Sequence, residues 1–233
     1  MKSLCVIMPI YNEEASIEKT FLEWHEAFEQ QNVFHQVQFL LINDGSKDDT
    51  LNIIRRLAST HKSINVIDKP NSGHGHSCLV GYQYSVEQNF DYTMQLDSDG
   101  QCDPRFFPFF LKKIVNHDIV YGFRYIRRDG FLRFMISRIL SVVAFFRTGI
   151  WVWDPNCPYR IFKTETIRDF VKTVDPTFFL INVVLALHHK RLGMKLVNIV
   201  FRERHGGSPS LNTMKLIKVG REFDRQLKFF KTE

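Results

Sequence analysis

Two aspartates follow an apolar segment in the stretch YTMQLDSDGQCDP, residues 92–104. Asp97 and Asp99 are two positions apart, and in an extended chain alternate side chains point the same way. Two neighbouring carboxylates repel each other, so at least one of them must meet a cation, a hydrogen-bond donor or a proton. The spacing therefore predicts a site that holds positive charge, and Gln101 adds a neutral oxygen two residues further on.

The glycine motifs that usually bind phosphate are missing from this sequence. The first predicted turn reads PIYNEE, without the glycines of a dinucleotide-binding motif, and no G-x-x-x-x-G-K-[ST] loop occurs. An anionic diphosphate could approach Asp97 and Asp99 only with a divalent cation between them. Hard oxygen ligands suit Mg²⁺ or Mn²⁺, whose remaining positions substrate phosphates and water would fill.

Strand-like and helix-like segments alternate with short connections over the first half of the chain, which argues for a parallel sheet with helices on both faces. The predicted strands are residues 4–10, 37–44, 64–69, 91–97 and 118–123, and the predicted helices are residues 12–30, 46–60, 75–88 and 104–117. Beyond residue 124 the pattern is less regular, with strands near residues 159–163 and 194–204, a helix over residues 179–193 and a C-terminal helix. We expect one α/β domain with a less regular second half.

Acidic and amide side chains follow three of the predicted strands. Asn12 and Glu13 come after the first, Asp44 ends the second, and Asp97 and Asp99 follow the fourth. Each could merely cap a turn or a helix. Ligands of open parallel sheets collect beyond the carboxyl ends of the strands, so we expect these side chains to converge at one edge.

Four segments in this order resemble the N-terminal motifs of family 2 glycosyltransferases: VIMPIYNEE, LLINDGSKDDT, KPNSGHGHS and QLDSDGQCDP. The resemblance covers roughly residues 4–125. It implies a GT-A fold, with a Rossmann-like and mostly parallel sheet flanked by helices in a single domain. It also implies an inverting, metal-dependent transfer from a nucleotide-diphosphate sugar, although the residues do not separate UDP from GDP.

The resemblance also implies roles for individual residues. Asp97 and Asp99 would be catalytic and, with Gln101, would hold Mg²⁺ or Mn²⁺, with Asp99 and Gln101 as the more direct ligands. Asp44 would contact the base. The nucleotide-binding residues would be Pro9, Tyr11, Asn12, Glu13, Asp44 and Asp97. His74 and His76 depart from the family pattern, in which lysine or small residues are common, and a histidine at such a turn is more often structural than a ligand.

The second half is similar to polyprenyl- and dolichyl-phosphate sugar transferases in GFRYIRRDG, LRFMISRIL, DPNCPYRIF and VFRERHGGSPS. The resemblance implies that Arg124 and Arg133 take part in transfer, and that the acceptor phosphate is bound by Arg124, Arg133, Ser137 and Arg204. Cys157-Pro158-Tyr159 departs from the usual Ser-Gly-Phe, and Asn182 stands where relatives often carry glutamate. An alternative acceptor is a sugar hydroxyl on a lipid-linked or surface polysaccharide.

The chemistry of the acceptor gives an independent argument for a phosphate. An attacking alcohol normally needs a general base to take its proton, whereas a phosphate oxygen is already anionic and needs cations to position it. Asp154 is a candidate base on the acceptor side, and it suits a structural cap equally well. The balance of residues therefore favours a phosphate acceptor.

The net charge of +6 is concentrated in two stretches. Residues 124–147 carry six arginines against one aspartate, and residues 201–233 are also basic; both stretches are rich in large apolar residues. Such segments suit a bilayer surface. We expect a nucleotide-sugar-binding half at residues 1–123, an acceptor-binding half at residues 124–210 and an amphipathic helix at residues 211–233.

The rest of the composition narrows the compartment and the class of protein. The four cysteines are far apart and read as reduced thiols. We expect no signal peptide, because Pro9 and the acidic residues come too early, and no spanning helix, because no apolar run approaches roughly 18–20 residues. These features predict a cytoplasmic protein, peripheral at the cytoplasmic face of the membrane. A non-catalytic membrane- or nucleic-acid-binding module is the remaining class, and the acidic strand ends oppose nucleic acid.

Overall fold

The computed structural model describes residues 2–31, 33–126, 131–178, 180–206 and 227, without the side chains of residues 131–134 and 136. Its centre is a seven-stranded sheet with the strand order β3-β2-β1-β4-β6-β5-β7. All neighbouring strands run parallel except β6, which is antiparallel to both β4 and β5. The strands are β1 (Ser3–Ile10), β2 (Gln36–Asp44), β3 (Ile64–Lys69), β4 (Tyr92–Gln95), β5 (Ile119–Ile126), β6 (Arg160–Lys163) and β7 (Lys195–Val200).

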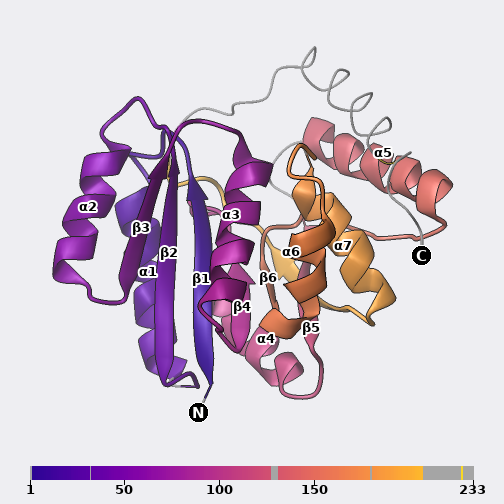
Figure 1. Ribbon diagram of the computed structural model, residues 1–233, viewed down its shortest axis with the longest axis horizontal. Helices are drawn as coiled ribbons and strands as arrows, with labels where there is room; N and C mark the ends of the chain where they lie inside the picture. The colour runs from indigo at the N-terminus through magenta and orange to yellow at the C-terminus, as the bar shows by residue number, and fades with distance from the viewer. Residues whose placement is uncertain (1, 32, 127–130, 179, 207–226, 228–233) are drawn as a thin grey trace.

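Helices cover both faces of the sheet, as a parallel sheet requires. Figure 1 shows α3 and α6 in front of the sheet and α1 behind it. The helices are α1 (Ile17–Gln31), α2 (Thr50–Thr60), α3 (His74–Glu87), α4 (Phe107–Ile114), α5 (Phe131–Thr148), α6 (Arg168–Thr173) and α7 (Ile181–Arg191). Two 3₁₀ helices, Pro104–Phe106 and Thr164–Ile167, precede α4 and α6.

The alternation of side chains along each strand divides the core into two layers. Leu4 and Val6 of β1 pack in the layer formed with α1, α2 and α4, where Trp24 is fully buried. Cys5 and Ile7 pack in the other layer, formed with α3, α5, α6 and α7. Every residue of β1 is buried, because strands flank it on both sides and helices cover both of its faces.

Helix α5 buries one face and exposes the other. Its buried residues recur at helical spacing, namely Ser137, Leu140, Ser141 and Ala144. Its exposed apolar residues recur at the same spacing on another face, namely Met135, Ile139, Val142 and Phe146. Within the described part of the chain, no helix combines the length and the apolar character that crossing a bilayer requires.

The predicted fold class is confirmed, because the structure is a single mixed α/β domain with a mostly parallel sheet flanked by helices. The predicted strands and helices of the first half are all present. The predicted C-terminal helix at residues 211–233 lies outside the described residues, apart from Leu227. The division into a donor half and an acceptor half stays a prediction.

Candidate active site

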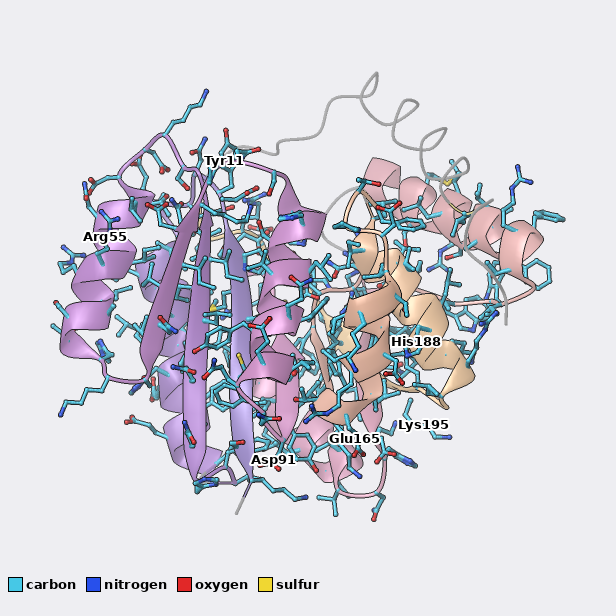
Figure 2. All side chains as sticks on the ribbon, viewed as in Figure 1. Tyr11, Arg55, Asp91, Glu165, His188 and Lys195 are labelled. Carbon is cyan, nitrogen blue, oxygen red and sulfur yellow. The ribbon has the colours of Figure 1, made fainter. Side chains whose placement is uncertain are left out.

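The loop after β1 is joined to the loop after β2 by hydrogen bonds. The Asn12 N–H donates to Ser46 Oγ at 3.0 Å, and the Glu13 N–H donates to Thr50 Oγ1 at 2.9 Å. Asn12 has a φ of 53°, a left-handed conformation that asparagine adopts more readily than most residues. Tyr11 is 41% exposed at this edge of the molecule, where Figure 2 labels it beyond the carboxyl ends of β1 to β3.

Asp44 is buried at the end of β2 and orders the turn that precedes α3. Its Oδ1 accepts from the Lys69 ammonium and from the Ser72 N–H at 2.9 Å, and its Oδ2 accepts from the Gly73 N–H at 2.9 Å. The Asn71 side chain donates to the Asp44 carbonyl at 2.8 Å. A contact between Asp44 and a nucleotide base stays a prediction, and the structure gives this carboxylate an internal role as well.

Asp97 and Asp99 follow β4 at the same edge, next to the end of β1. Ser98 between them donates to the Pro9 carbonyl at 3.0 Å, which ties the two strand ends together. Asp99 is 7% exposed, and its Oδ1 accepts from the Gln101 N–H at 3.0 Å. The Asp97 side chain is 30% exposed, yet its Oδ1 atom is buried and accepts no hydrogen bond from the described residues.

The electrostatics of the acid pair follow from burial and mutual repulsion. Burial, and next the charge of Asp97, raise the pKa of the Asp99 carboxyl to about 6, against the opposing effects of the Gln101 N–H and Arg204. Asp99 therefore changes charge near the physiological range. A carboxyl in this position gains from any added cation, because a cation lowers the free energy of its ionised form.

Residues 201–206, which we call the strap, leave β7 and run along the acid pair. The Arg202 N–H donates to the Gln101 carbonyl at 3.1 Å, and the His205 N–H donates to the Asp99 carbonyl at 3.0 Å. Arg204 forms an ion pair with Glu13, and its Nε lies 3.7 Å from Asp99 Oδ2. The strap thus places a cation between the carboxylates of two separate strand ends.

Gly100 makes the close approach of the strap to the acid pair possible. Its φ is 78°, a conformation that residues with a Cβ rarely adopt. A Cβ at this position would lie 2.0 Å from Cδ2 of the His205 ring. Both requirements explain why glycine follows Asp99.

On the other side of the sheet centre, Arg124 at the end of β5 is bound by Asp154. Arg124 Nε donates to Asp154 Oδ2 at 2.7 Å, and Nη2 donates to Oδ1 at 2.6 Å, in a pair that is almost completely buried. Ser137 of α5 donates to Asp154 Oδ1 at 3.2 Å. The Arg124 guanidinium also lies 5.0 Å from the centre of the Phe201 ring. Asp154 therefore joins β5 to α5.

The structure brings some of the predicted acceptor residues together and places one elsewhere. Arg124 and Ser137 share Asp154, as described above, whereas Arg204 contacts Glu13 and Asp99, which follow β1 and β4. The side chain of Arg133 lies outside the described residues. The acceptor-phosphate roles of all four stay predictions.

Sequence reasoning named His74 and Asn182 but missed Arg202 and Glu23, which also lie at this edge. Arg202 donates to the Gly100 carbonyl at 3.2 Å and pairs with Glu23 of α1 at 2.6 Å. Asn182 of α7 is buried, with its Nδ2 3.3 Å from His74 Nε2. His74 Nε2 in turn lies 3.8 Å from Asp97 Oδ1. The arginines at positions 202 and 204 indicated a basic segment, but no sequence pattern could show which acidic side chains these arginines contact.

The carboxylates fit a divalent cation that a substrate helps to bind. The buried Oδ1 of Asp97 without a hydrogen bond is an acceptor that a cation could satisfy. Across the described residues, no set of three or more His, Cys, Asp or Glu side chains is arranged to hold a metal ion. Mg²⁺ sites with one or two carboxylates, completed by substrate phosphates and water, do not require such a set.

Fold and site together define a class, the glycosyltransferases with a GT-A fold. The model of "Glycosyl transferase family 2" matches residues 5–173, and the chain belongs to this family. The expectation from the four N-terminal motifs is confirmed.

Two named relatives are bacterial sugar transferases. An undecaprenyl-phosphate 4-deoxy-4-formamido-L-arabinose transferase of Pseudomonas fluorescens is 24% identical over 92% of this chain, which spans 62% of that relative's length. An undecaprenyl-phosphate mannosyltransferase of Micrococcus luteus is 25% identical over 88% of this chain and 86% of the relative. The chain thus spans less than two thirds of one relative and most of the other.

Solved structures share the fold at lower identity. Glucosyl-3-phosphoglycerate synthase from Mycobacterium tuberculosis, in complex with UDP, aligns with a TM-score of 0.65 and 19% identity over 97% of this chain and 79% of its own. The same enzyme with Mn²⁺, UDP and phosphoglyceric acid also gives a TM-score of 0.65, with 20% identity over 97% of this chain and 77% of its own. These likenesses show the fold.

Proposed function

We propose that this chain is an inverting glycosyltransferase that moves a sugar from a nucleotide-diphosphate sugar to a polyprenyl phosphate at a membrane surface. Two kinds of similarity support the proposal. The named relatives are undecaprenyl-phosphate sugar transferases. The structural neighbour has been solved with UDP and with Mn²⁺ or Mg²⁺.

The donor would bind at the edge where Asp97 and Asp99 lie. Tyr11, Asn12 and Glu13 would line the nucleoside, and Asp97, Asp99 and Gln101 would hold Mg²⁺ or Mn²⁺. When bound, the divalent ion supplies charge neutralisation for the diphosphate leaving group. Arg204 lies against Glu13 and Asp99, so it is placed to add a second positive charge beside the diphosphate.

The observation that carries the choice of acceptor is the ion pair between Asp154 and Arg124. A hydroxyl acceptor needs a general base, and Asp154 is the acidic residue that the sequence offered for it. Asp154 instead accepts two hydrogen bonds from the Arg124 guanidinium and one from the Ser137 hydroxyl, and it is 4% exposed. Asn182, where relatives often carry glutamate, is an amide and not a base. A phosphate monoester acceptor needs no general base, because its attacking oxygen is already anionic.

The exposed face of α5 supports an acceptor held in a membrane. Phe146 is 81% exposed and Ile139 is 54% exposed, and Trp153 nearby is 52% exposed. Arg138 lies 5.8 Å from the centre of the Trp153 ring. Apolar side chains interleaved with arginines are the composition of helices that lie in the bilayer interface. Ser137 on the buried face links this helix to Arg124 through Asp154.

A product assay tests the proposal. The full chain is incubated with UDP- and GDP-sugars, Mn²⁺ and polyprenyl phosphate in detergent, and the lipid fraction is analysed for a lipid-linked monosaccharide and its anomeric configuration. We expect transfer with inversion to polyprenyl phosphate and loss of transfer in chelator. Transfer to a saccharide hydroxyl but not to the lipid phosphate would contradict the proposed acceptor.

A further inference from the structure

The strap contacts the rest of the domain at both of its ends. Near β7, Arg202 pairs with Glu23 of α1 at 2.6 Å. At the far end the backbone runs close against the loop that follows β1, because a Cβ on Gly206 would lie 2.9 Å from the Cβ of Ala15. The far end of the strap is therefore held by contacts with the loop after β1.

The Glu13 carboxylate in that loop uses one oxygen for the strap and the other for its own loop. Its Oε1 accepts from Arg204 Nη2 in an ion pair. Its Oε2 accepts from the Ser16 hydroxyl at 2.6 Å. The Glu13 side chain is 11% exposed, and Ser16 is buried. Each oxygen thus has a donor from the protein, and little of the carboxylate is open to a ligand.

Arg204 depends on Glu13 for its position. Among the described residues, Glu13 is the only side chain that forms a hydrogen bond with Arg204. The Arg204 Nε atom is buried and 3.7 Å from Asp99 Oδ2, which is beyond hydrogen-bond distance. Asp99 therefore attracts the guanidinium without fixing its orientation. A partly buried cation is costly without a partner, so loss of Glu13 should release Arg204 from this place.

The position of Arg204 is coupled to the backbone of the strap. The next residue, His205, donates its N–H to the Asp99 carbonyl at 3.0 Å. The ion pair with Glu13 and this backbone hydrogen bond are one residue apart along the chain. Release of Arg204 should therefore also weaken the contact between the strap and the loop that carries Asp99.

We propose that the ion pair between Glu13 and Arg204 is a latch that holds the strap against the acid pair, and that Glu13 is a positioning residue that acts through Arg204. The inference rests on the proposed function where it concerns the donor, because Arg204 is then the cation held beside the diphosphate. It narrows the role that the family resemblance implies for Glu13, whose carboxylate serves the strap and not the nucleoside.

Amide hydrogen exchange in the ligand-free chain tests the latch without any nucleotide. The probe is the His205 N–H, which exchanges when its hydrogen bond to Asp99 opens. We expect Glu13→Ala and Arg204→Ala each to speed this exchange at least about tenfold, and the double variant to be no faster than either single variant. The amides of β1 are the internal reference, because a general loss of stability would speed their exchange as well.

Two further variants control for changes other than the loss of the latch. Glu14→Ala removes the neighbouring carboxylate, which accepts from the Asp49 N–H at 2.8 Å instead of from the strap, and it should leave the exchange of the His205 N–H unchanged. Glu13→Gln keeps the side-chain shape and an acceptor for Arg204. It should speed the exchange less than Glu13→Ala, and it keeps the test decisive if the alanine variant does not fold.

Nucleotide affinity tests whether Glu13 acts through Arg204. Calorimetry with UDP or GDP and Mn²⁺ compares the wild type, Glu13→Ala, Arg204→Ala and the double variant. A positioning role predicts that the double variant binds no more weakly than Arg204→Ala alone, because Glu13 has no separate contact to lose. Additive losses would mean that the Glu13 carboxylate contacts the nucleotide directly.

The outcomes decide the two parts of the inference separately. Unchanged exchange of the His205 N–H in Glu13→Ala, or equal acceleration in Glu14→Ala, overturns the latch. Additive losses of nucleotide affinity overturn the positioning role. If the wild type binds neither UDP nor GDP with Mn²⁺, the proposed function fails and the positioning role fails with it. The exchange data on the ligand-free chain still decide the latch in that case, so the two failures are distinguishable.

Discussion

At the scale of single residues, the site is a set of acids whose charges other side chains balance. Asp99 is buried beside the charges of Asp97 and Glu13, and its Oδ2 lies 3.7 Å from Arg204 Nε. The folded protein therefore carries a carboxyl whose ionisation it opposes. Such a residue is typical of a functional site, where stability is lost in exchange for affinity toward a ligand.

Asp99→Asn should stabilise the ligand-free protein at neutral pH. A carboxyl whose folded pKa is raised to about 6 contributes stability below its unfolded pKa, and this is lost as the pH rises through about 6. The loss is on the order of 3 kcal/mol above pH 7. Thermal unfolding at pH 7.5 should show a higher Tm for Asp99→Asn than for the wild type.

The same comparison near pH 4.5 is the control for this prediction. There the wild-type carboxyl is mostly protonated in the folded state, so the difference in Tm should shrink. An equal gain at both pH values would mean that the stabilisation has a cause other than the charge of Asp99.

The sequence predicted which residues lie at the edge of the sheet where the parallel strands end, but not which of their side chains contact one another. Parallel strands end at the same edge of a sheet, and this rule was sufficient to place the residues that come at the strand ends, namely Asn12, Glu13, Asp44, Asp97 and Asp99. The ion pair between Arg204 and Glu13 joins residues 191 positions apart. Such pairs depend on how a connecting segment folds back, and local spacing carries no information about that.

At the scale of elements, the strap is what joins the end of the sheet to the acid pair. Its backbone bonds to Asp99 and Gln101 place His205 over Gly100, where a side chain on residue 100 would collide with the ring. The strap also contacts Arg124 through Phe201. It therefore lies between the proposed donor and acceptor sides.

Gly100→Ala should destabilise the protein by about 2–4 kcal/mol, because it adds a clash with His205 to the strain of a left-handed φ. Gly149→Ala is the matched control. Gly149 has a φ of 70°, and nothing lies within 4 Å of a Cβ placed there, so this variant carries the strain alone. Chemical denaturation should show a clearly larger loss for Gly100→Ala. Equal losses of unfolding free energy in the two variants would mean that His205 does not restrict the space at residue 100.

Helix α5 should bind membranes through its exposed apolar face. Ile139→Glu and Phe146→Glu place a carboxylate on that face and should reduce sedimentation with anionic vesicles several-fold, without changing nucleotide affinity. Val115→Glu is the control, because Val115 is 71% exposed and follows α4. Vesicle binding that responds equally to all three substitutions, or to none, would contradict a role for this face.

At the scale of the whole molecule, periodicity and turn residues were enough to predict the sheet and its helices. Segments such as residues 4–10 are continuously apolar, which indicates a strand buried on both faces, and the structure buries all of β1. The antiparallel direction of β6 between β4 and β5 was not predicted, since the pattern of residues 159–163 indicates a strand but not its neighbours.

The arrangement of the domain relates the proposed partners to one another. The proposed donor side lies at the carboxyl ends of β1, β2 and β4, and α5 follows β5 at the other half of the sheet (Figure 1). Arg124 and Asp154 connect that half to the buried face of α5. A lipid phosphate presented along α5 would thus approach the sheet from the side of Arg124, while the nucleotide occupies the side of Tyr11.

The central claim is that the carboxylates of Asp97 and Asp99 bind a nucleotide diphosphate through a divalent ion. Titration calorimetry of UDP and GDP with the wild type and Asp99→Ala, each with Mn²⁺ and with chelator, tests it most directly. We predict that the wild type binds one of the two nucleotides at least about tenfold more tightly with Mn²⁺, and that Asp99→Ala loses this difference. Nucleotide binding of equal strength in chelator, or an Asp99→Ala variant that keeps the full effect of Mn²⁺, would contradict the claim.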